Sequence, residues 1–499
     1  MASMETATPS ASHQLPALEV LEGVGITIQG WMMKKGGTMG WSDRWFELHG
    51  NILKVKKTPE DREMRSEFTI TDRTTVADLD SAPCGLQVIF DGNKALKLRA
   101  VSEPDSAAWK QAIQAVIKFE RESRKITVSG FVFDIPAFYE MSRLLGKGAY
   151  GCVVAAVDTR NGANIAIKKV GEAFADKEDA KRILREIRLM RSLRHHPNVL
   201  RITDLLKPPS LDTFDDVYIV TEQMTTDLQR LLQAKKVVLT EDQQQWIMYQ
   251  ILCGLKYLHT ASVLHRDLKP ANVLVNTEDC SVKICDFGLS RVGDAKEEMT
   301  DYVVTRWYRA PEVLMNNKHY GDPIDMWAVG CIFAEIIGRR VLLPGKDFVD
   351  QLRLIVKLIG SPESGELEAF VTDREALKFM RKLPPSRGRD LVDLFPDASA
   401  VCLALLRSML TIDPAKRISD DDAIAHPYLR DVRVPKDHEF VAGGVVEMED
   451  IEGLELSKVN LQRMIFQEII HFHADLEADS AADKAAAAMG GLRTADGSE

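Results

Sequence analysis

The sequence has no long apolar run. No window approaches the roughly 18 uncharged apolar residues that a membrane-spanning helix needs, and the richest stretch, Met326 to Ile337, is short and contains Glu335. The first residues lack the charged-then-apolar pattern of a secretory signal, and Ala2 stands where N-myristoylation requires glycine. We therefore expect a cytoplasmic or nuclear protein without a permanent membrane anchor.

Cysteine is sparse and positive charge is not in excess. The seven cysteines form no C-x-x-C pair and the eleven histidines do not cluster with them, which excludes a zinc site or a disulfide framework and predicts reduced thiols. Cys285 fits a small core hydrophobe better than a reactive thiol. The net charge of -10 argues against a general nucleic-acid binder. With 499 residues, 45% of them apolar, the chain has material for roughly three globular domains.

The stretch from Val263 to Gly288 gathers acids, a lysine and an asparagine between short apolar strands. Two β-branched runs, 273–275 and 282–284, flank the turn 276–279 and predict a hairpin that brings the loops on either side together. Four side chains are thereby expected to meet: Asp267, Lys269, Asn272 and Asp286. Two carboxylates and an amide oxygen suit magnesium, which prefers oxygen ligands and retains substrate phosphates. This predicts phosphoryl transfer.

The strings HRDLKPAN at 265–272 and DFG at 286–288 resemble the catalytic and metal-binding loops of eukaryotic protein kinases, without a substitution. Upstream, the glycines of GKGAYG at 146–151 let backbone approach a phosphate closely. Dinucleotide-binding folds share that spacing but need a helix directly afterwards, whereas 152–157 is β-like and is followed by Lys168 in a strand. The nicotinamide interpretation is therefore rejected.

The kinase resemblance implies a role for each matching residue. The glycines and Lys168 would hold ATP, and Glu186, on the inward stripe of the following helix, would pair with Lys168. By this resemblance the catalytic residues are Asp267, Lys269, Lys168 and Glu186, the ATP-binding residues are Gly146, Lys147, Gly148, Gly151, Val153, Lys168, Thr221, Met224 and Asp227, and the magnesium ligands are Asn272 and Asp286.

Thr300, Asp301 and Tyr302 form a T-x-Y segment before VVTRWYRAPE, which resembles the activation segment of mitogen-activated protein kinases. Two phosphates there would add about -1.5 to -2 charge each, and arginines could order the loop around them. The resemblance implies that phosphothreonine is read by Arg182, Arg185, Arg266 and Arg291, and phosphotyrosine by Arg306 and Arg309. The segment WYRAPE implies proline after the target residue.

Further kinase positions are expected to be structural. Residues 326–337 are apolar nearly all round and predict a buried central helix, with Asp325 at its start holding the catalytic loop. The resemblance implies an ion pair between Glu312 and Arg417. The family's docking groove has an acidic pair after HPYL, but Val434 occupies one of those places. Docking of basic linear motifs is therefore expected to be weakened.

Short alternating strands from Ile26, followed by a helix from Pro104 with Trp109, Ile113, Val116 and Ile117 on one stripe, predict a small β-barrel capped by one helix. With GWMMKKGG and WSDRWFEL, this module resembles a pleckstrin-homology (PH) domain. The resemblance implies phosphoinositide contacts from Lys34, Lys35 and Arg44, although Ser42 stands where lipid binders usually have a second basic residue.

The basic residues of the PH-like module allow two interpretations. Residues 30–57 contain six basic side chains and two acids. Each basic residue near an anionic leaflet can contribute about 1 kcal/mol, so peripheral attachment is feasible. The competing interpretation is that strand lysines protect exposed edges and that the module packs against its neighbour in an autoregulatory role.

The expected fold class is multidomain α+β: a pleckstrin-homology β-barrel and a bilobal kinase. The predicted segments are a disordered leader (1–24), the PH module (25–122), a linker (123–138), the kinase (139–429, with the small lobe to about 224), a C-terminal extension packing on it (430–475) and a disordered tail (476–499).

We expect an ATP- and Mg²⁺-dependent serine/threonine kinase of the mitogen-activated type, proline-directed and activated at Thr300 and Tyr302. Its partners would be an upstream dual-specificity kinase, Ser/Thr-Pro substrates and phosphoinositide membranes, but not nucleic acid. The alternative is a catalytically silent scaffold or adaptor, which predicts the loss of at least one catalytic residue. None is lost.

Overall fold

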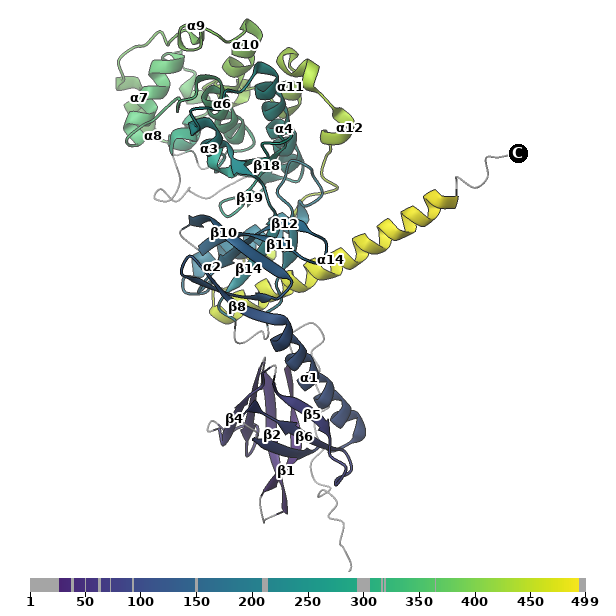
Figure 1. Cartoon of the computed structure of the whole chain (residues 1–499). Coiled ribbons are helices and arrows are strands. Elements are labelled where there is room, and N and C mark those ends of the chain that lie inside the picture. Colours follow the sequence, from purple (N-terminus) through teal and green to yellow (C-terminus); the bar gives the residue numbers. More distant parts are fainter. Residues whose placement is uncertain are drawn as a thin grey trace, which may run out of the picture. The chain divides into compact units, whose positions relative to one another are not determined.

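The protein is described by a computed structural model of residues 27–36, 40–49, 51–61, 64–71, 73–91, 94–148, 151–208, 214–293, 306–315, 317, 320–363 and 365–492, with side chains given for most of them. It divides into two compact units: residues 1–179, 204–220 and 456–499, and residues 180–203 and 221–455. Figure 1 labels the helices and strands. None of the helices in the described residues is both long and apolar enough to cross a membrane.

The first unit begins with a seven-stranded antiparallel sheet of strand order β4-β3-β2-β1-β7-β6-β5. Five of these strands follow the predicted alternating runs, while β4 and β5 were not predicted because each is only four residues long. The elements are β1 (Thr27–Gly36), β2 (Gly40–His49), β3 (Ile52–Lys56), β4 (Ser66–Thr69), β5 (Thr75–Asp78), β6 (Gly85–Ile89), β7 (Ala95–Arg99) and α1 (Glu103–Glu122).

Helix α1 closes this sheet with the predicted apolar stripe. Trp109 and Ile113 are fully buried and join a core with strand residues such as Phe46. The Trp109 and Phe46 rings meet edge to face, 6.4 Å apart. Such a pair adds roughly 0.5–1.5 kcal/mol beyond the burial of its area. The prediction of a β module capped by one helix is confirmed.

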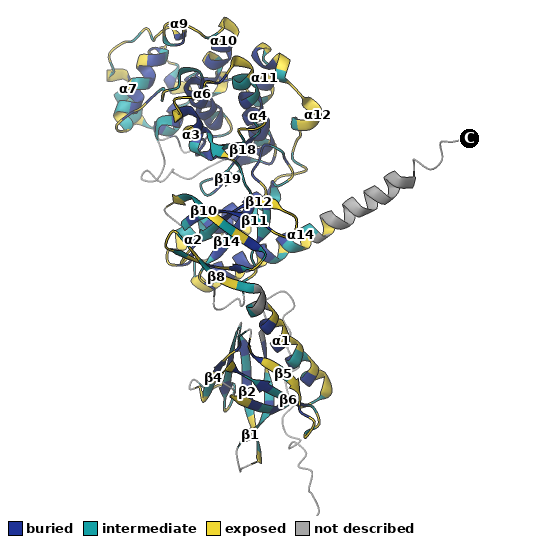
Figure 2. Cartoon of the chain, in the orientation of Figure 1, coloured by how far each residue is buried: buried dark blue, intermediate teal, exposed yellow. Residues whose placement is uncertain are grey.

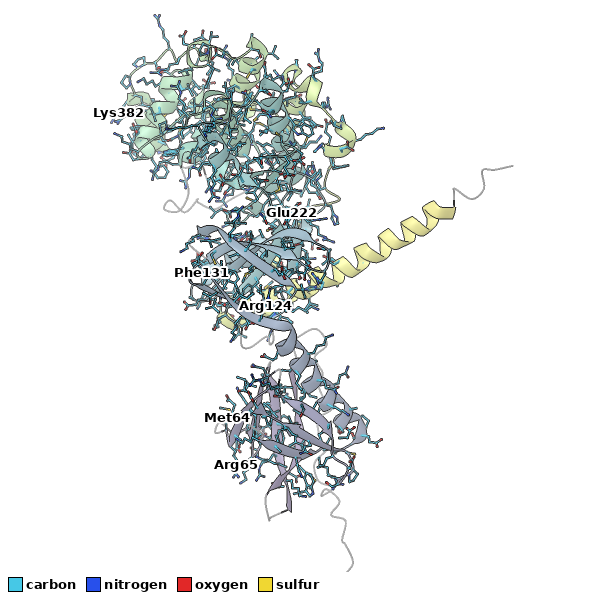
Figure 3. All side chains as sticks on the ribbon, viewed as in Figure 1. Met64, Arg65, Arg124, Phe131, Glu222 and Lys382 are labelled. Atoms are coloured by element: carbon cyan, nitrogen blue, oxygen red, sulfur yellow. The ribbon has the colours of Figure 1, made fainter. Side chains whose placement is uncertain are left out.

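Residues 123–136, within the segment predicted as a linker, form a hairpin. Strand β8 (Ser123–Val128) follows α1 directly and pairs with β9 (Phe131–Pro136). Phe131 is labelled in Figure 3. Phe133 and Ile135 of β9 are fully buried in the core of the following sheet. A segment whose side chains complete a core is part of that domain.

The second sheet of this unit has the strand order β10-β11-β12-β14-β13. Its strands are β10 (Tyr139–Gly148), β11 (Gly151–Asp158), β12 (Ala163–Val170), β13 (Ile202–Leu205) and β14 (Val217–Glu222). The side chains of Val154, Ile165 and Ile167 are buried in its core. Burial alternates toward both ends of β11, while residues 154–156 in its middle are all buried.

Helix α14 (Lys458–Leu492) brings the C-terminal extension back to this sheet. Gln462 donates to the Phe214 carbonyl at 2.8 Å, and His473 lies 2.8 Å from the Leu205 carbonyl. Ile465, Phe466 and Phe472 are buried beside them. The helix continues to Leu492, so the backbone of 476–492 is helical rather than disordered as predicted; residues 493–499 lie outside the described range.

The second unit is mainly helical and is centred on two buried helices, α4 and α6, which are largely dark blue in Figure 2. Thr240 and Gln243 form the capping box that begins α4. The remaining elements are α2 (Lys177–Ser192), β15 (Thr226–Asp227), α3 (Leu228–Gln233), α4 (Glu241–Thr260), β16 (Val263–Leu264), η2 (Pro270–Asn272), β17 (Val273–Val275), β18 (Val282–Ile284), β19 (Arg291–Val292), η3 (Arg306–Tyr308), α5 (Pro311–Leu314), α6 (Pro323–Gly338), α7 (Phe348–Ile359), η4 (Leu367–Ala369), α8 (Arg374–Lys382), α9 (Leu391–Leu394), α10 (Ala400–Met409), η5 (Pro414–Lys416), α11 (Asp420–Ile424), η6 (Pro427–Val432), α12 (Pro435–His438) and α13 (Glu449–Glu452).

The division of the kinase differs from the expected boundary near residue 224. Most of α2 groups with the second unit, although it precedes β14 in the chain. Ion pairs supply a physical reason, because Arg185 and Arg188 of α2 bind Glu452 and Asp450 of α13. The order of residues in the chain does not show that α2 and α13 are joined by ion pairs.

Candidate active site

The hairpin predicted around the catalytic loop is present. Strands β17 and β18 pair antiparallel, with Val273 opposite Ile284. In the loop before β17, Asp267 Oδ2 accepts from Lys269 Nζ at 2.6 Å and from Asn272 Nδ2 at 3.1 Å. Asp267 is 7% exposed, so a small area of this carboxylate reaches the surface. The predicted convergence of these three side chains is confirmed.

Asp286 is connected to the same loop by a backbone hydrogen bond of the preceding residue, Cys285. The N–H of Cys285 donates to the Asn272 carbonyl at 3.0 Å, which ties the segment between β18 and Asp286 to the catalytic loop. The Asp286 side chain is exposed, whereas Phe287 is fully buried with its ring centroid 5.4 Å from that of His265. Burial of Phe287 anchors the DFG segment, while the carboxylate of Asp286 stays exposed to solvent.

Two residues of the site have strained backbone. Arg266 has φ 68° and Asp286 has φ 70°, both in the left-handed region that non-glycine residues seldom adopt. Such strain costs on the order of 1–3 kcal/mol and persists only where surrounding contacts hold it. Asp325 holds the backbone of Arg266 in this conformation. Its carboxylate accepts from the N–H of His265 at 2.7 Å and from the N–H of Arg266 at 2.8 Å. The predicted role of Asp325 is confirmed.

The imidazole of His259 contacts the carboxylate of Asp325. Its imidazole lies between the carboxylates of Asp325, at 3.3 Å, and Asp420, at 2.6 Å. Burial opposes its charge, but the hydrogen bonds to Asp325 and Asp420 outweigh burial and raise the pKa of His259 to about 10. Burial likewise opposes ionisation of Asp325, yet the bonds from His259 and from backbone lower its pKa. The pair is therefore charged at neutral pH.

This arrangement predicts a pH dependence of stability. Because the pKa of folded His259 is raised to about 10 from its ordinary value of 6.5, its contribution is complete below pH 6.5 and is lost as the pH rises through 10. The loss is at most about 1.4 kcal/mol per pH unit. We expect the melting temperature of the chain to fall between pH 7 and 10, and less steeply in His259→Gln. Parallel curves for the two proteins would contradict this.

The oxygens of this loop fit a magnesium ion. Asn272 Nδ2 is used within the loop, donating to Asp267 Oδ2 and to the Asp267 carbonyl at 2.9 Å. This orientation leaves the amide oxygen of Asn272 as the end that could meet a cation. The exposed carboxylate of Asp286 supplies a second hard ligand, and Mg²⁺ commonly takes one or two carboxylates together with substrate phosphates.

The first unit holds the predicted phosphate-binding hairpin. Gly146 of β10, Val153 of β11 and Lys168 of β12 are paired in register, one opposite the next. Adjacent paired residues point to the same face of a sheet. Gly151 has φ 155°, and a Cβ there would lie 1.9 Å from the Lys169 carbonyl oxygen, so glycine is required. Lys147 and Gly148 end β10 beside this row.

The predicted adenine-side residues lie at the end of β14 and after it, in the second unit. Thr221 is buried, and Met224 is half-buried in the segment after the strand. Asp227 is the N-cap of α3, accepting from the Arg230 N–H at 2.8 Å. Glu222, labelled in Figure 3, pairs with Lys283 of β18 at 3.0 Å. Ion pairing therefore fastens the end of this strand to the hairpin of the catalytic loop.

Glu186 lies where the sequence predicted, on the buried face of α2, and is 7% exposed. Lys168 belongs to the first unit and Glu186 to the second. Their ion pair stays a prediction.

The charges of two other predicted phosphate-reading arginines act on Arg266. Burial is the largest cause that lowers the pKa of Arg266, and the positive charges of Arg291 and Arg185 lower it further. Within the described residues, Arg266 Nε and Nη1 are buried and have no hydrogen-bond acceptor. A cluster of positive charge with unfilled donors is suited to an anion. Arg182 is half-buried on the same helix as Arg185.

The arginines predicted to read phosphotyrosine lie elsewhere in the second unit. Arg306 and Arg309 both lie over the ring of Phe348, at 5.6 and 5.5 Å from its centroid. Thr300 and Tyr302 lie outside the described residues, so the structure gives no geometry for the phosphorylation sites. The assignment of these arginines stays a prediction.

The PH module has its own basic cluster. Lys34 and Lys94 lie 5.6 and 4.7 Å from the centre of the Phe68 ring. Burial, followed by the charges of Arg44 and Lys94, lowers the pKa of Lys34. Lys35 lies instead over Trp41, at 5.9 Å. Sequence reasoning identified Lys34 and Arg44 but missed Lys94, which no motif marks and which only the fold brings to them.

Comparison with known proteins agrees with this geometry. Residues 139–429 match the protein kinase domain family and residues 26–118 match the PH domain family. Mitogen-activated protein kinase 6 of Arabidopsis thaliana is 43% identical over 351 residues, covering 70% of this chain and 87% of the relative. Mitogen-activated protein kinase 1 of Oryza sativa subsp. japonica is 43% identical over 372 residues, covering 74% and 92%.

A third relative, mitogen-activated protein kinase 5 of Arabidopsis thaliana, is 50% identical over 303 residues, which cover 60% of this chain and 80% of the relative. The strand order, the catalytic loop and these similarities agree on one family. The chain is a serine/threonine protein kinase that belongs to the mitogen-activated protein kinases and carries an N-terminal PH domain.

Proposed function

We propose that this kinase transfers the γ-phosphoryl group of ATP to serine or threonine residues followed by proline. The observation that carries the proposal is the hydrogen-bonded set of Asp267, Lys269 and Asn272. Asp267 would orient the substrate hydroxyl and accept its proton, Lys269 would steady the γ-phosphate, and Lys168 would position the nucleotide. Mg²⁺, held by Asn272 and Asp286, would neutralise charge on the phosphates.

We further propose that phosphorylation of Thr300 and Tyr302 by an upstream dual-specificity kinase activates the chain. The support is the arginine cluster around Arg266, whose buried Nε and Nη1 have no acceptor within the described residues. A phosphate dianion would fill these donors with charge-assisted hydrogen bonds, which are roughly twice as strong as neutral ones. Satisfying a buried cation in this way would order the surrounding loop.

A kinase assay tests this proposal. Wild-type protein phosphorylated at Thr300 and Tyr302 should phosphorylate a Ser-Pro peptide at least tenfold faster than the Thr300→Val/Tyr302→Phe variant given the same treatment, because ordering of the site depends on the phosphates. A peptide with alanine after the serine should be a poor substrate. Thr277→Val, at an exposed turn, should behave as wild type. Equal rates from wild type and the double variant would refute activation by these residues.

For the PH domain we propose recruitment to anionic membranes. The positive charges of Arg44 and Lys94 act on Lys34, and Lys34 and Lys94 both lie near the ring of Phe68. Like charges held together are stabilised by an anion, and a phosphoinositide headgroup supplies several negative charges. Ser42, at the position where lipid binders usually carry a second basic residue, instead lies 3.4 Å from the Lys34 carbonyl. Lys94 would replace the missing charge.

Liposome sedimentation checks membrane recruitment. Replacing Lys34 and Arg44 with alanine should weaken binding to phosphoinositide-containing vesicles about thirtyfold, because each basic residue contributes about 1 kcal/mol. Arg73→Ala/Lys97→Ala removes the same charge elsewhere on the domain and should have a smaller effect. Binding should also weaken with added salt. The proposal of recruitment through this cluster is wrong if the wild-type protein does not bind these vesicles. It is also wrong if both double variants bind them equally.

A further inference from the structure

The sheet that carries Lys168 has a second paired row next to the predicted phosphate-binding row. Lys147 of β10, Cys152 of β11 and Lys169 of β12 are paired in register, one opposite the next. Each of the three is the chain neighbour of a residue in the phosphate-binding row, and successive side chains of a strand point to opposite faces of the sheet. The three side chains therefore lie on the face away from Lys168.

Strand β9 of the hairpin at 123–136 covers this second face. Cys152 is buried in one core with Phe133 and Ile135 of β9. Burial raises the pKa of the Cys152 thiol, and the positive charges of Lys169 and Lys147 oppose that rise. Both ammonium groups are therefore close enough to act on the thiol, at the border of the core that β9 completes.

Lys169 fastens β9 to the sheet. Its Nζ donates to the Val132 carbonyl of β9 and pairs with the carboxylate of Asp216, just before β14, each at 2.6 Å. The Lys169 side chain is 15% exposed. Burial opposes its charge, but the hydrogen bond to Asp216 and the negative charge of that residue outweigh burial and raise the pKa of Lys169. One charged ammonium group therefore joins the hairpin to the sheet.

Tyr218 of β14 makes a second contact with the same hairpin. Its hydroxyl accepts from the Asp134 N–H at 3.1 Å and donates to Asp216 Oδ2 at 3.4 Å. Its ring centroid lies 6.2 Å from that of Phe133 and 5.5 Å from Lys169 Nζ. The carboxylate of Asp216 thus binds both groups that hold β9.

The hairpin reaches the predicted phosphate-binding segment through Phe131, which is labelled in Figure 3. Lys147 Nζ lies 4.9 Å from the centroid of the Phe131 ring, within the range of a cation–π contact. Lys147 stands between Gly146 and Gly148, and an added Cβ at either glycine would meet no described atom within 4 Å. The glycines supply no packing of their own, so the contact of Lys147 with Phe131 supports this end of β10.

We propose that Lys169 is a positioning residue for ATP. It holds the β8–β9 hairpin against the sheet, and Phe131 of that hairpin then holds Lys147 and the glycines beside it in place for the phosphates. The inference rests on the proposed function, because these glycines are proposed to bind ATP. Lys169 acts through the hairpin and touches no phosphate, since it lies on the face away from Lys168.

Hydrogen exchange on the unphosphorylated full-length chain measures the first step without using activity. Lys169→Met removes the ammonium group, so the amides of 131–136 and 151–154 should exchange about tenfold faster, which corresponds to about 1.4 kcal/mol. Lys169→Arg keeps the charge and should recover part of the protection. Lys125→Met is the matched control, because it removes the same charge from the same hairpin in an exposed pair with Asp134 and should exchange as wild type.

ATP affinity is the second measurement, as KM in the phosphorylated enzyme and as the dissociation constant from titration calorimetry. In Lys169→Met both constants should rise about tenfold while KM for the Ser-Pro peptide stays unchanged. General destabilisation would not produce that split. Phe131→Leu removes the aromatic face and should weaken ATP binding in the same direction. The double variant should bind ATP no more weakly than Lys169→Met alone, because both changes act through one contact.

Equal exchange in Lys169→Met and Lys125→Met would overturn the proposal, because Lys169 would then not hold the hairpin. Faster exchange together with unchanged ATP affinity would overturn it as well, since the hairpin would have no effect on the nucleotide. If the wild-type chain binds ATP but transfers no phosphate, the proposed function fails. The exchange and calorimetry results would then still decide whether Lys169 positions the ATP-binding segment.

Discussion

Replacing Asp267 with asparagine is expected to lower kcat by a factor of about 10²–10⁴, the usual contribution of a positioned general base. Asparagine has the same shape but cannot accept the proton of the substrate hydroxyl. In the wild type, Asp267 Oδ2 accepts from Lys269 Nζ at 2.6 Å and from Asn272 Nδ2 at 3.1 Å. The substitution therefore also removes the counter-charge of Lys269. KM for ATP should change little, because Asp267 is not proposed to bind the nucleotide.

Phosphate incorporation into a Ser-Pro peptide measures this effect, with both proteins first phosphorylated at Thr300 and Tyr302. Asp397→Asn is the control, since Asp397 is exposed and makes the same chemical change away from the loop. Matching melting temperatures would show that Asp267→Asn folds. Equal incorporation by Asp267→Asn and wild type would refute the catalytic assignment and would favour the alternative of a silent scaffold.

Replacing Arg417 with methionine is expected to destabilise the kinase domain by about 3–5 kcal/mol, because it leaves Glu312 charged and buried without a partner. The side chain of Arg417 is fully buried and that of Glu312 is 2% exposed. Two hydrogen bonds join them, at 2.8 and 3.0 Å. Arg417 also donates to the Thr411 carbonyl and lies 5.2 Å from the centre of the Trp327 ring.

A double-mutant cycle separates the cost of an unpaired charge from the cost of lost packing. Chemical unfolding should show that Glu312→Gln/Arg417→Met is more stable than Arg417→Met alone, because the second substitution removes the buried charge. Glu368→Gln breaks an exposed pair with Arg381 and should unfold at the same denaturant concentration as wild type. An Arg417→Met variant as stable as wild type would show that the pair contributes little.

The catalytic loop could be predicted because its contacts are local. From Val263 to Gly288 a single tight hairpin decides which side chains meet, and the strands at 273–275 and 282–284 are marked by β-branched residues. Turn chemistry and strand propensity act over a few residues and are therefore visible in one sequence. The apolar stripe of α1 was predictable for the same reason, since helical periodicity reveals the buried face.

Predictions failed where a short polar segment gains its structure from distant partners. The hairpin at 123–136 was taken for a linker because its charged residues hide the alternation of Phe133 and Ile135. The pairing of Arg185 with Glu452 was not predicted because 267 residues separate them in the chain. No periodicity connects two charges at that distance in the chain.

The sequence by itself determined the chemistry of this protein: the kinase motifs, their order and the hairpin that joins Asp267, Asn272 and Asp286 follow from local propensities and residue types. Only the tertiary structure decided how charged groups are shared. It assigns Arg185 to Glu452, places His259 between Asp325 and Asp420, and brings Lys94 to Lys34. Pairing of charges depends on distance in space, which the fold sets and the order of residues does not reveal.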